Sequence, residues 1–327
     1  MNRPSLLYPA VIEHAATLIG KTPWEVSRDG DLLFDAQFKA HEVYGHSPVV
    51  CGIDVYHAEV ECWGAKVLAA AGGTVPALGD PPLLETGSIL ELRQLDARKE
   101  GRFPMLLDAA ARLAKALPGV EVNVPVAGPV SIAAGLLGFE TVLMEFAEAG
   151  DDLRQAIEFL AGRQADLCRQ LLALGFIPII YESGAAPPLV SPALFREIVG
   201  PALRIVLAPG VESGIPVACI IGGDVATVAA DLFAAGPGML ICPAETDQQA
   251  FMRAAADYPD VTVRLNMPAR LFSSGKREEV FAAIDDLLPL ALGHPRGLLG
   301  TGVLVCDCDP GLVLEAIAYT RDAAARA

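Results

Sequence analysis

Short runs of β-branched and other apolar residues alternate along this chain with longer stretches rich in Ala, Leu and Glu. The apolar runs predict strands at residues 49–53, 121–126, 177–182, 216–221, 239–243, 261–266 and 297–302. The stretches around them predict helices at residues 88–96, 102–117, 131–136, 139–147, 151–174, 192–214, 225–234, 248–258, 276–292 and 310–325. Such alternation is typical of repeated βα units around a parallel sheet. Seven strands of this kind indicate a barrel, in which the helices within residues 139–174 form an insertion between two units.

The chain is expected to form one domain, residues 1–327, because no Ser/Pro-rich linker or abrupt change of composition divides it. Its length suits an α/β barrel with extra helices. We therefore predict a TIM-type (β/α)8 barrel with additional N-terminal helices, in which residues 1–48 are an N-terminal helical extension. An open doubly wound sheet is the alternative, but no Gly-x-Gly-x-x-Gly turn follows the first predicted strand.

Charge and cysteine content narrow the classes of function. The net charge of −16 disfavours nucleic acid, an anionic membrane or a polyanionic substrate as a partner, because each needs a cationic surface. The longest uncharged run, residues 122–139, contains two prolines, an asparagine and three glycines, unlike a membrane span. Seven scattered cysteines, an odd number, argue against a disulfide framework and fit reduced thiols. With no secretion signal recognisable in the first residues, a cytoplasmic location is expected.

Polar side chains follow most of the predicted strands, at the end where a parallel barrel has its active site. Carboxylates near an apolar core cost several kcal/mol unless something pairs with them, so these groups are expected to hold a proton, a cation or a substrate. Helix capping is an equally good interpretation for Asp224 and Asp247. The residues concerned are Asp54, His57, Glu59, Glu182, Asp224, Glu245, Asp247 and Asn266.

Glu182, at the end of a buried strand, is the strongest single candidate. Cys219 and Cys242 lie in or at the ends of two neighbouring predicted strands and would complete a zinc site with Glu182. The alternative is that both thiols are buried and act as small apolar residues. His57 is a candidate general base or metal ligand, or else an ordinary hydrogen-bonding residue of a loop.

Several short motifs occur together over most of the chain. They are Gly52-Ile53-Asp54 with Glu59-Val60-Glu61-Cys62-Trp63-Gly64, Gly101-Arg102-Phe103-Pro104, Gly128-Pro129-Val130-Ser131-Ile132-Ala133, Ser191-Pro192 with Phe195, and Gly300-Thr301-Gly302. In these motifs the sequence resembles the uroporphyrinogen decarboxylase superfamily, and within it the cobamide-dependent methyltransferases. The resemblance implies a distorted (β/α)8 barrel with a deep central cleft.

The sequence also departs from two branches of that superfamily. The Arg-Gln-Ala-Gly-Arg-Tyr segment with which true decarboxylases hold a tetrapyrrole polyanion is missing, and acidic residues outnumber basic ones by 40 to 24. Thiol methyltransferases carry a His-x-Cys zinc motif, and the matching positions here are Cys219 and Ile221. The chain is more similar to the enzymes that demethylate aryl methyl ethers, through Glu182, Glu197 and Cys219, the last where that branch has histidine.

The resemblance implies a methyltransferase that moves a methyl group from a small methylated donor, such as an O-methyl ether, to the corrinoid (cobalamin) of a partner protein. Tetrahydrofolate is the alternative acceptor, and zinc is an implied cofactor. The alternative functions are a uroporphyrinogen-type decarboxylase, a thiol methyltransferase and a non-catalytic tetrapyrrole-binding barrel. The implied residues are Glu182, His57, Glu245 and Asp224 for catalysis, Asp54, Tyr56, Glu59, Asn266, Arg264 and Asp247 for substrate binding, and Glu182, Cys219 and Cys242 for the metal.

Overall fold

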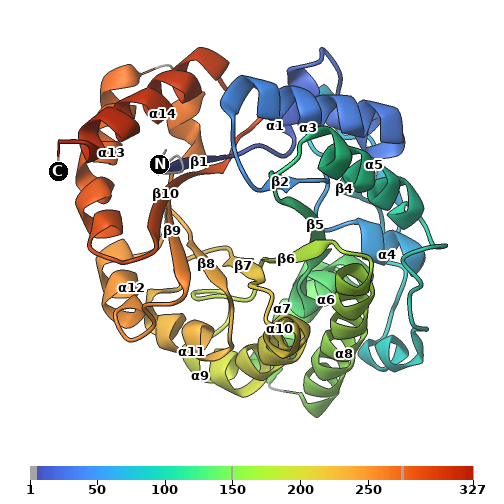
Figure 1. The fold of residues 1–327 in the computed structure, drawn as a ribbon. Coiled ribbons are helices and arrows are strands. Elements are labelled where there is room, and N and C mark those ends of the chain that lie inside the picture. Colours follow the sequence, from blue (N-terminus) through green and yellow to red (C-terminus); the bar gives the residue numbers. More distant parts are fainter. Residues whose placement is uncertain (1–5, 149, 274–275, 327) are drawn as a thin grey trace.

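One curled sheet of eight parallel strands organises the molecule, and the computed structural model describes it through residues 6–148, 150–273 and 276–326. The strands lie in the order β1-β10-β9-β8-β7-β6-β5-β2, and the sheet curls into a ring with helices around its outside (Figure 1). The fold is therefore α/β and of the TIM-barrel type. The strands are β1 (Leu7–Ala10), β2 (Val49–Val50), β5 (Val122–Ala127), β6 (Ile177–Glu182), β7 (Ala218–Ile221), β8 (Met239–Cys242), β9 (Thr262–Met267) and β10 (Gly297–Val303).

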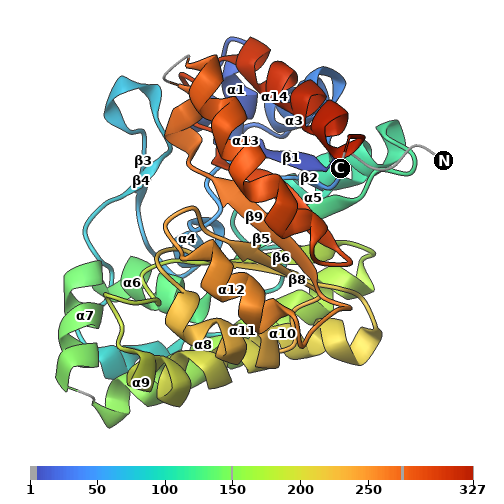
Figure 2. The same cartoon turned by 90° about the vertical axis from the view of Figure 1, so that its left-hand side faces the viewer.

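The helices follow the strands as crossover connections. Two further strands, β3 (Val67–Leu68) and β4 (Ala77–Leu78), form a small antiparallel ribbon that is separate from the barrel sheet and lies beside one end of the barrel (Figure 2). The α-helices are α1 (His14–Thr17), α2 (Pro23–Arg28), α3 (Gly30–Tyr44), α4 (Ala58–Cys62), α5 (Phe103–Ala116), α6 (Pro129–Leu137), α7 (Phe139–Glu148), α8 (Asp151–Ala173), α9 (Pro192–Leu194), α10 (Gly200–Ser213), α11 (Ala229–Ala234), α12 (Gln248–Ala255), α13 (Arg277–Leu292) and α14 (Pro310–Ala324).

All seven predicted strands are present, and the sequence pattern missed the eighth, β1. That strand has four residues and contains Pro9, which has no backbone N–H, and it lies at one end of the strand order, where proline is tolerated. Residues 1–48 therefore include a barrel strand, and α1, α2 and α3 lie between β1 and β2 in the chain.

The predicted helix at residues 88–96 is wrong. A 3-10 helix covers Thr86–Glu91, and the chain that follows is irregular. The side chain of Gln170 in α8 accepts a hydrogen bond from the backbone N–H of Ala97 (3.0 Å) and donates one to the carbonyl of Leu95 (2.8 Å). A tertiary contact thus takes the backbone groups that a helix would have used.

Side chains of the barrel strands alternate between the interior of the ring and the layer under the helices. Tyr8, Ile179, Tyr181, Ala218 and Ile241 are among those that face the interior or line its cavity. Their neighbours along each strand pack into the larger core between sheet and helices, and they include Leu7, Ile180, Cys219, Leu240 and Cys242. This period of two decides which strand residues can reach a central site.

The two end strands of the sheet meet through a side chain. The Tyr8 hydroxyl of β1 donates a hydrogen bond to the carbonyl oxygen of Pro48, directly before β2, at 2.7 Å. Among the described residues no backbone ladder joins β1 to β2. This contact bridges the gap between β1 and β2, the two ends of the curled sheet.

In the described parts of the chain, no single helix has both the length and the apolar composition needed to cross a membrane. The consecutive helices α6 and α7 have this length and composition only when they are taken together, and they are bent by 115° relative to each other.

Candidate active site at the barrel mouth

The segment from Gly52 to α4 brings most of the polar groups to the carboxyl ends of β2, β5 and β6. The strand β2 stops at Val50, and Gly52 then passes so close to Pro125 that a β-carbon would lie 2.6 Å from that ring. A residue with a side chain would not fit there, which explains why glycine occupies this position. The turn delivers Asp54, Tyr56 and His57 in sequence and starts α4, on which Glu59 is fully buried.

Asp54 is held by Arg102, the residue before α5. The guanidinium binds both carboxylate oxygens, with Nη1 to Oδ1 at 2.8 Å and Nη2 to Oδ2 at 2.7 Å. Arg102 also donates through Nε to Glu61 (2.6 Å), and Glu61 in turn binds Arg28. Burial alone would raise the pKa of Asp54, but the neighbouring His57 and Arg102 hold it below its usual value. Asp54 is therefore a fixed anion.

His57 lies beside that anion. Its Nδ1 is 3.5 Å from Oδ2 of Asp54, and the side chain keeps 13% of its surface exposed. Nδ1 is buried and has no hydrogen-bond partner in the described structure. Hydrogen bonds of catalytic groups are often long before a ligand binds. The pair thus has the arrangement of an acid–base histidine with a carboxylate that orients it.

Glu59 is a carboxyl group that can hold a proton near neutral pH. Its Oε1 accepts a hydrogen bond from the backbone N–H of Ala127 at the end of β5 (2.8 Å). Its Oε2 is buried and has no partner in the part of the chain that the structure describes. Burial raises the pKa of Glu59 to about 7.

Glu182 has a structural task that the sequence analysis did not anticipate. Its Oε2 accepts a hydrogen bond from the backbone N–H of Val130 (2.9 Å), and its Oε1 accepts from those of Ser131 (2.8 Å) and Ser183 (2.9 Å). The Ser131 hydroxyl is a fourth donor. The carboxyl group therefore caps the amino end of α6, where N–H groups otherwise lack partners. Burial raises the pKa of Glu182 to about 7, against the lowering effect of these donors.

Gly128 makes this cap sterically feasible. A β-carbon on Gly128 would lie 2.3 Å from Oε2 of Glu182, so no other residue could occupy the turn without moving the carboxyl group. Gly128 and Ser131 belong to one of the motifs that carry the family resemblance, and the structure gives that motif a physical role at the start of α6.

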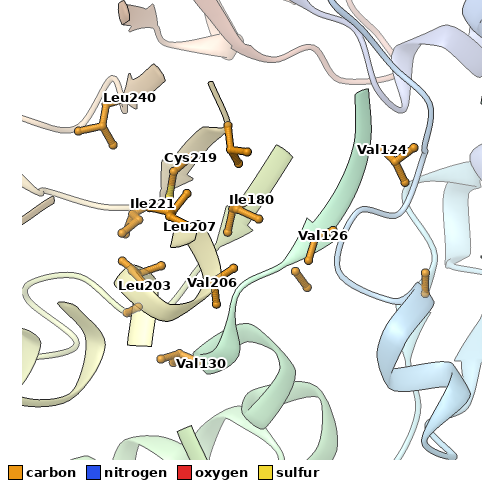
Figure 3. Close-up of a cluster of buried hydrophobic side chains, with 14 of the residues drawn as sticks. Val124, Val126, Val130, Ile180, Leu203, Val206, Leu207, Cys219, Ile221 and Leu240 are labelled. Atoms are coloured by element: carbon orange, nitrogen blue, oxygen red, sulfur yellow. The ribbon is translucent and has the colours of Figure 1, made fainter. Parts of the chain in front are cut away.

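The three expected zinc ligands do not come together. The side chains of Cys219 and Cys242 point away from the barrel interior, into the core between sheet and helices. Figure 3 shows Cys219 among Leu203, Leu207 and Leu240. Burial raises the pKa of both thiols, which disfavours the thiolate that zinc needs. Within the described residues no three His, Cys, Asp or Glu side chains form a metal-binding group. The residues present do not fit the zinc site, and the buried apolar interpretation describes both cysteines.

Three predicted acids lie on the other side of the mouth. Asp224, Glu245 and Asp247 follow β7 and β8, and all three are exposed. Asp247 caps α12 by accepting the N–H of Ala250 at 3.0 Å, and Asp224 accepts the N–H of Ala226 at 3.1 Å. The capping interpretation therefore holds for Asp247, whereas Asp224 accepts a hydrogen bond within a turn that precedes a 3-10 helix and is not the N-cap of that helix.

Tyr56 and Asn266 occupy the inside of the mouth. Tyr56 packs edge-on against Tyr181, with ring centroids 6.2 Å apart, and burial raises its pKa to about 12, with Glu182 and Ser183 nearby. Asn266 accepts a hydrogen bond from Nε of Arg264 at 3.2 Å. The structure thus brings together Asp54, Tyr56, His57 and Glu59 near Glu182, whereas the exposed acids form a second group.

Three residues that shape this site were not predicted from the sequence: Arg102, Ser131 and Tyr181. Arg102 and Ser131 stood within the motifs already noted, but a motif does not state which residue contacts which. Tyr181 could have been found from strand parity, because it precedes the outward-facing Glu182 and must face inward.

Comparison with known proteins fits this architecture. The sequence profile of the family described as uroporphyrinogen decarboxylase (URO-D) matches residues 8–305. The structure is similar to that of a "methyltransferase from Methanosarcina mazei", with a TM-score of 0.80, 18% identity, and coverage of 98% of this chain and 93% of that one. It is less similar to 3-keto-D-glucoside 4-epimerase YcjR from E. coli in its apo form, with a TM-score of 0.33, 12% identity, and coverage of 66% and 94%. No curated protein matched the sequence. Because the family profile spans most of the sequence, the chain belongs to the uroporphyrinogen decarboxylase family.

Proposed function

We propose that this protein is a methyltransferase that takes a methyl group from a small methylated donor, such as an O-methyl ether, and passes it to the corrinoid of a partner protein. Family membership and the fold shared with a methyltransferase support an enzyme of this kind. The observation that carries the proposal is the pair of Asp54 and His57 held at the barrel mouth by the bidentate Arg102.

The chemistry explains why such a pair is needed. Breaking a C–O bond of a methyl ether leaves an alkoxide or phenoxide, which is a poor leaving group unless it is protonated. The corrinoid supplies the nucleophile that accepts the methyl group. His57 would donate its proton to the departing oxygen, and Asp54 would hold the imidazole in position and stabilise its charged form.

The charges of the site favour this reaction over decarboxylation of a tetrapyrrole. Arg102 is saturated by Asp54 and Glu61, and Arg28 is paired with Glu61. The Arg102 guanidinium is therefore not available to a substrate that carries many carboxylates, and the charge of Arg28 is already balanced by Glu61. An uncharged or weakly charged methylated donor suits the mouth better.

The test is methyl transfer to free Co(I) cobalamin, followed by the change in the cobalamin spectrum, with a panel of O-, N- and S-methylated donors. With an accepted donor, we expect His57→Gln to lower kcat by about 100-fold or more, because general acid catalysis contributes about 10²–10⁴-fold. The melting temperature should change little, because Gln is also polar and the bidentate contact of Arg102 still neutralises Asp54 in the variant.

His41→Gln is the matched control. His41 lies on α3, outside the mouth, and its ring nitrogen contacts the backbone of His46. This variant should retain the wild-type rate. A wild-type rate in His57→Gln would refute the role of His57, and decarboxylation of a porphyrinogen without methyl transfer from any donor would refute the proposed reaction.

A further inference from the structure

A buried guanidinium lies inside the barrel, below the mouth just described. Arg264 is in β9, only 5% of its surface is exposed, and its side chain lines an interior cavity. Barrel interiors of this fold are usually filled by layers of branched apolar side chains. A charged side chain there needs a specific reason.

The neighbouring strands are built around this side chain. Gly300 of β10 is in register with Asn266 of β9 on one side and Tyr8 of β1 on the other. A β-carbon on Gly300 would lie 2.8 Å from Cδ and 2.9 Å from Nε of Arg264. The missing side chain therefore lets Arg264 cross over β10, where its guanidinium lies over the Tyr8 ring at 4.6 Å from the centroid. Asn266 fixes Nε from the other side at 3.2 Å.

The guanidinium has no carboxylate partner among the described residues. The ion pairs of the described chain do not include Arg264, and the ionisable groups that act on it are the hydroxyls of Tyr8 and Tyr181. The Tyr8 hydroxyl already donates to Pro48. A buried cation left without an anion is strongly destabilising, so the folded protein is expected to recruit one.

The cavity beside Arg264 is small and mostly apolar. It has a volume of about 20 Å³, and its walls include Ile12, Val50, Ala218 and Ile241 as well as the two tyrosines. A space of this size admits a water molecule or a group of similar dimensions. None of the hydrogen bonds identified among the described residues uses the Tyr181 hydroxyl, which leaves it as a second donor beside the guanidinium.

We propose that this cavity binds one small monoanion, either the carboxylate group of a ligand or a free halide, between Arg264 and Tyr181. Arg264 supplies charge and a planar pair of donors, and Tyr181 supplies an O–H group. The apolar walls exclude larger hydrated anions. This site shares Tyr181 with the mouth but contains neither Asp54 nor His57, and its test does not depend on methyl transfer.

The test is thermal unfolding of the full chain in sodium gluconate, whose bulky anion is replaced stepwise by formate or chloride at constant ionic strength. For the wild type, we expect the midpoint to rise with the logarithm of the small-anion concentration, by about 4 °C at a concentration 100 times Kd. Arg264→Met should show no such rise. Tyr181→Phe, which keeps the ring and the fold, should need a higher anion concentration for the same rise.

Arg277→Met is the control for general salt effects, because Arg277 is an exposed residue of α13 paired with Glu315. It should respond to the anions as the wild type does. An equal response in Arg264→Met, or no response in the wild type and in Tyr181→Phe, overturns the proposal. The source of the anion follows from a comparison of the two small anions: stabilisation by formate points to the carboxylate group of a ligand, whereas stabilisation by chloride alone points to a free halide.

Discussion

Glu182 illustrates how the same residue can look catalytic in the sequence and serve a helix in the structure. An acid at the end of a buried strand needs a partner, as predicted from its position in the sequence. The partner is the amino end of α6, because the side chain of Glu182, like that of Ile180 two residues earlier, points outward from the barrel toward the helices. Strand parity was available from the sequence, but the position of the helix that receives the side chain was not.

At the scale of single residues, we expect Glu182→Gln to lower the free energy of unfolding by about 2–4 kcal/mol, because an amide NH2 would face backbone N–H donors. Urea denaturation measures this loss. Asp247→Asn is the control, since Asn caps a helix about as well as Asp and should cost less than about 0.5 kcal/mol. An unfolding free energy unchanged in Glu182→Gln would show that the cap is not needed for stability.

The other site residues were predictable to different degrees. Asp54, Tyr56, His57 and Glu59 follow one strand closely, so their proximity is a direct result of chain connectivity. The exposed position of Glu245 was not predictable, because it depends on how the loop after β8 turns. The sequence pattern identifies the rim of a barrel better than it identifies which rim residues face inward.

At the scale of elements, Arg102 joins the start of α5 to two earlier parts of the chain, the end of α2 and the loop and helix that follow β2. It stands before α5, binds Asp54 in the loop after β2 and Glu61 in α4, and donates to the carbonyl of Ser27 at the end of α2 (3.1 Å). These contacts link two of the motifs that carry the family resemblance. The motifs are therefore parts of one ion-pair network, which explains why they occur together in this chain.

Arg102→Met should lower the free energy of unfolding by about 3–5 kcal/mol, because it leaves the buried carboxylate of Asp54 without its guanidinium partner, while Glu61 keeps its ion pair with Arg28. In the double variant with Asp54→Leu, part of this loss should be recovered, and a double-mutant cycle by urea denaturation measures the coupling. Arg112→Met removes an exposed ion pair with Asp31 and should cost less than about 1 kcal/mol. Additive losses in the cycle would contradict a direct coupling of Arg102 to Asp54.

Element prediction succeeded where a strand was long and apolar and failed where tertiary contacts decide. The boundaries of β6 match those predicted, because it is a continuous buried run between turns. The strand β1 is short and contains a proline, so it gives little signal, and β3 and β4 are only two residues each. Their pairing partners, and not their own composition, make them strands.

For the whole molecule, buried acids predict how stability depends on pH. Burial raises the pKa of Glu13 and of Glu59 from 4.5 to about 7. The folded protein therefore keeps protons that the unfolded chain releases, and the stability they contribute is complete below about pH 4.5 and is lost as pH rises through about 7. For Glu59 the full loss is on the order of 3 kcal/mol.

Glu59→Gln removes one of these titrations, so its unfolding free energy relative to the wild type should increase between about pH 5 and pH 7.5. Urea denaturation at both pH values measures the difference. Glu278→Gln, at an exposed position of α13, should change in parallel with the wild type. A difference between Glu59→Gln and the wild type that stays constant with pH would mean that Glu59 is ionised in the folded protein throughout this range.

The contact between Tyr8 and Pro48 also affects where the barrel can open. Elsewhere around the ring, separating adjacent strands means breaking several amide bonds at once, whereas at this seam the described residues present one phenolic bond. Thermal separation of adjacent strands is therefore expected to occur mainly between β1 and β2. The ring of Tyr8, whose hydroxyl closes this gap, is also the ring that lies against Arg264. An anion bound in the cavity beside Arg264 is therefore expected to affect how firmly the barrel stays closed, because Tyr8 takes part in both contacts.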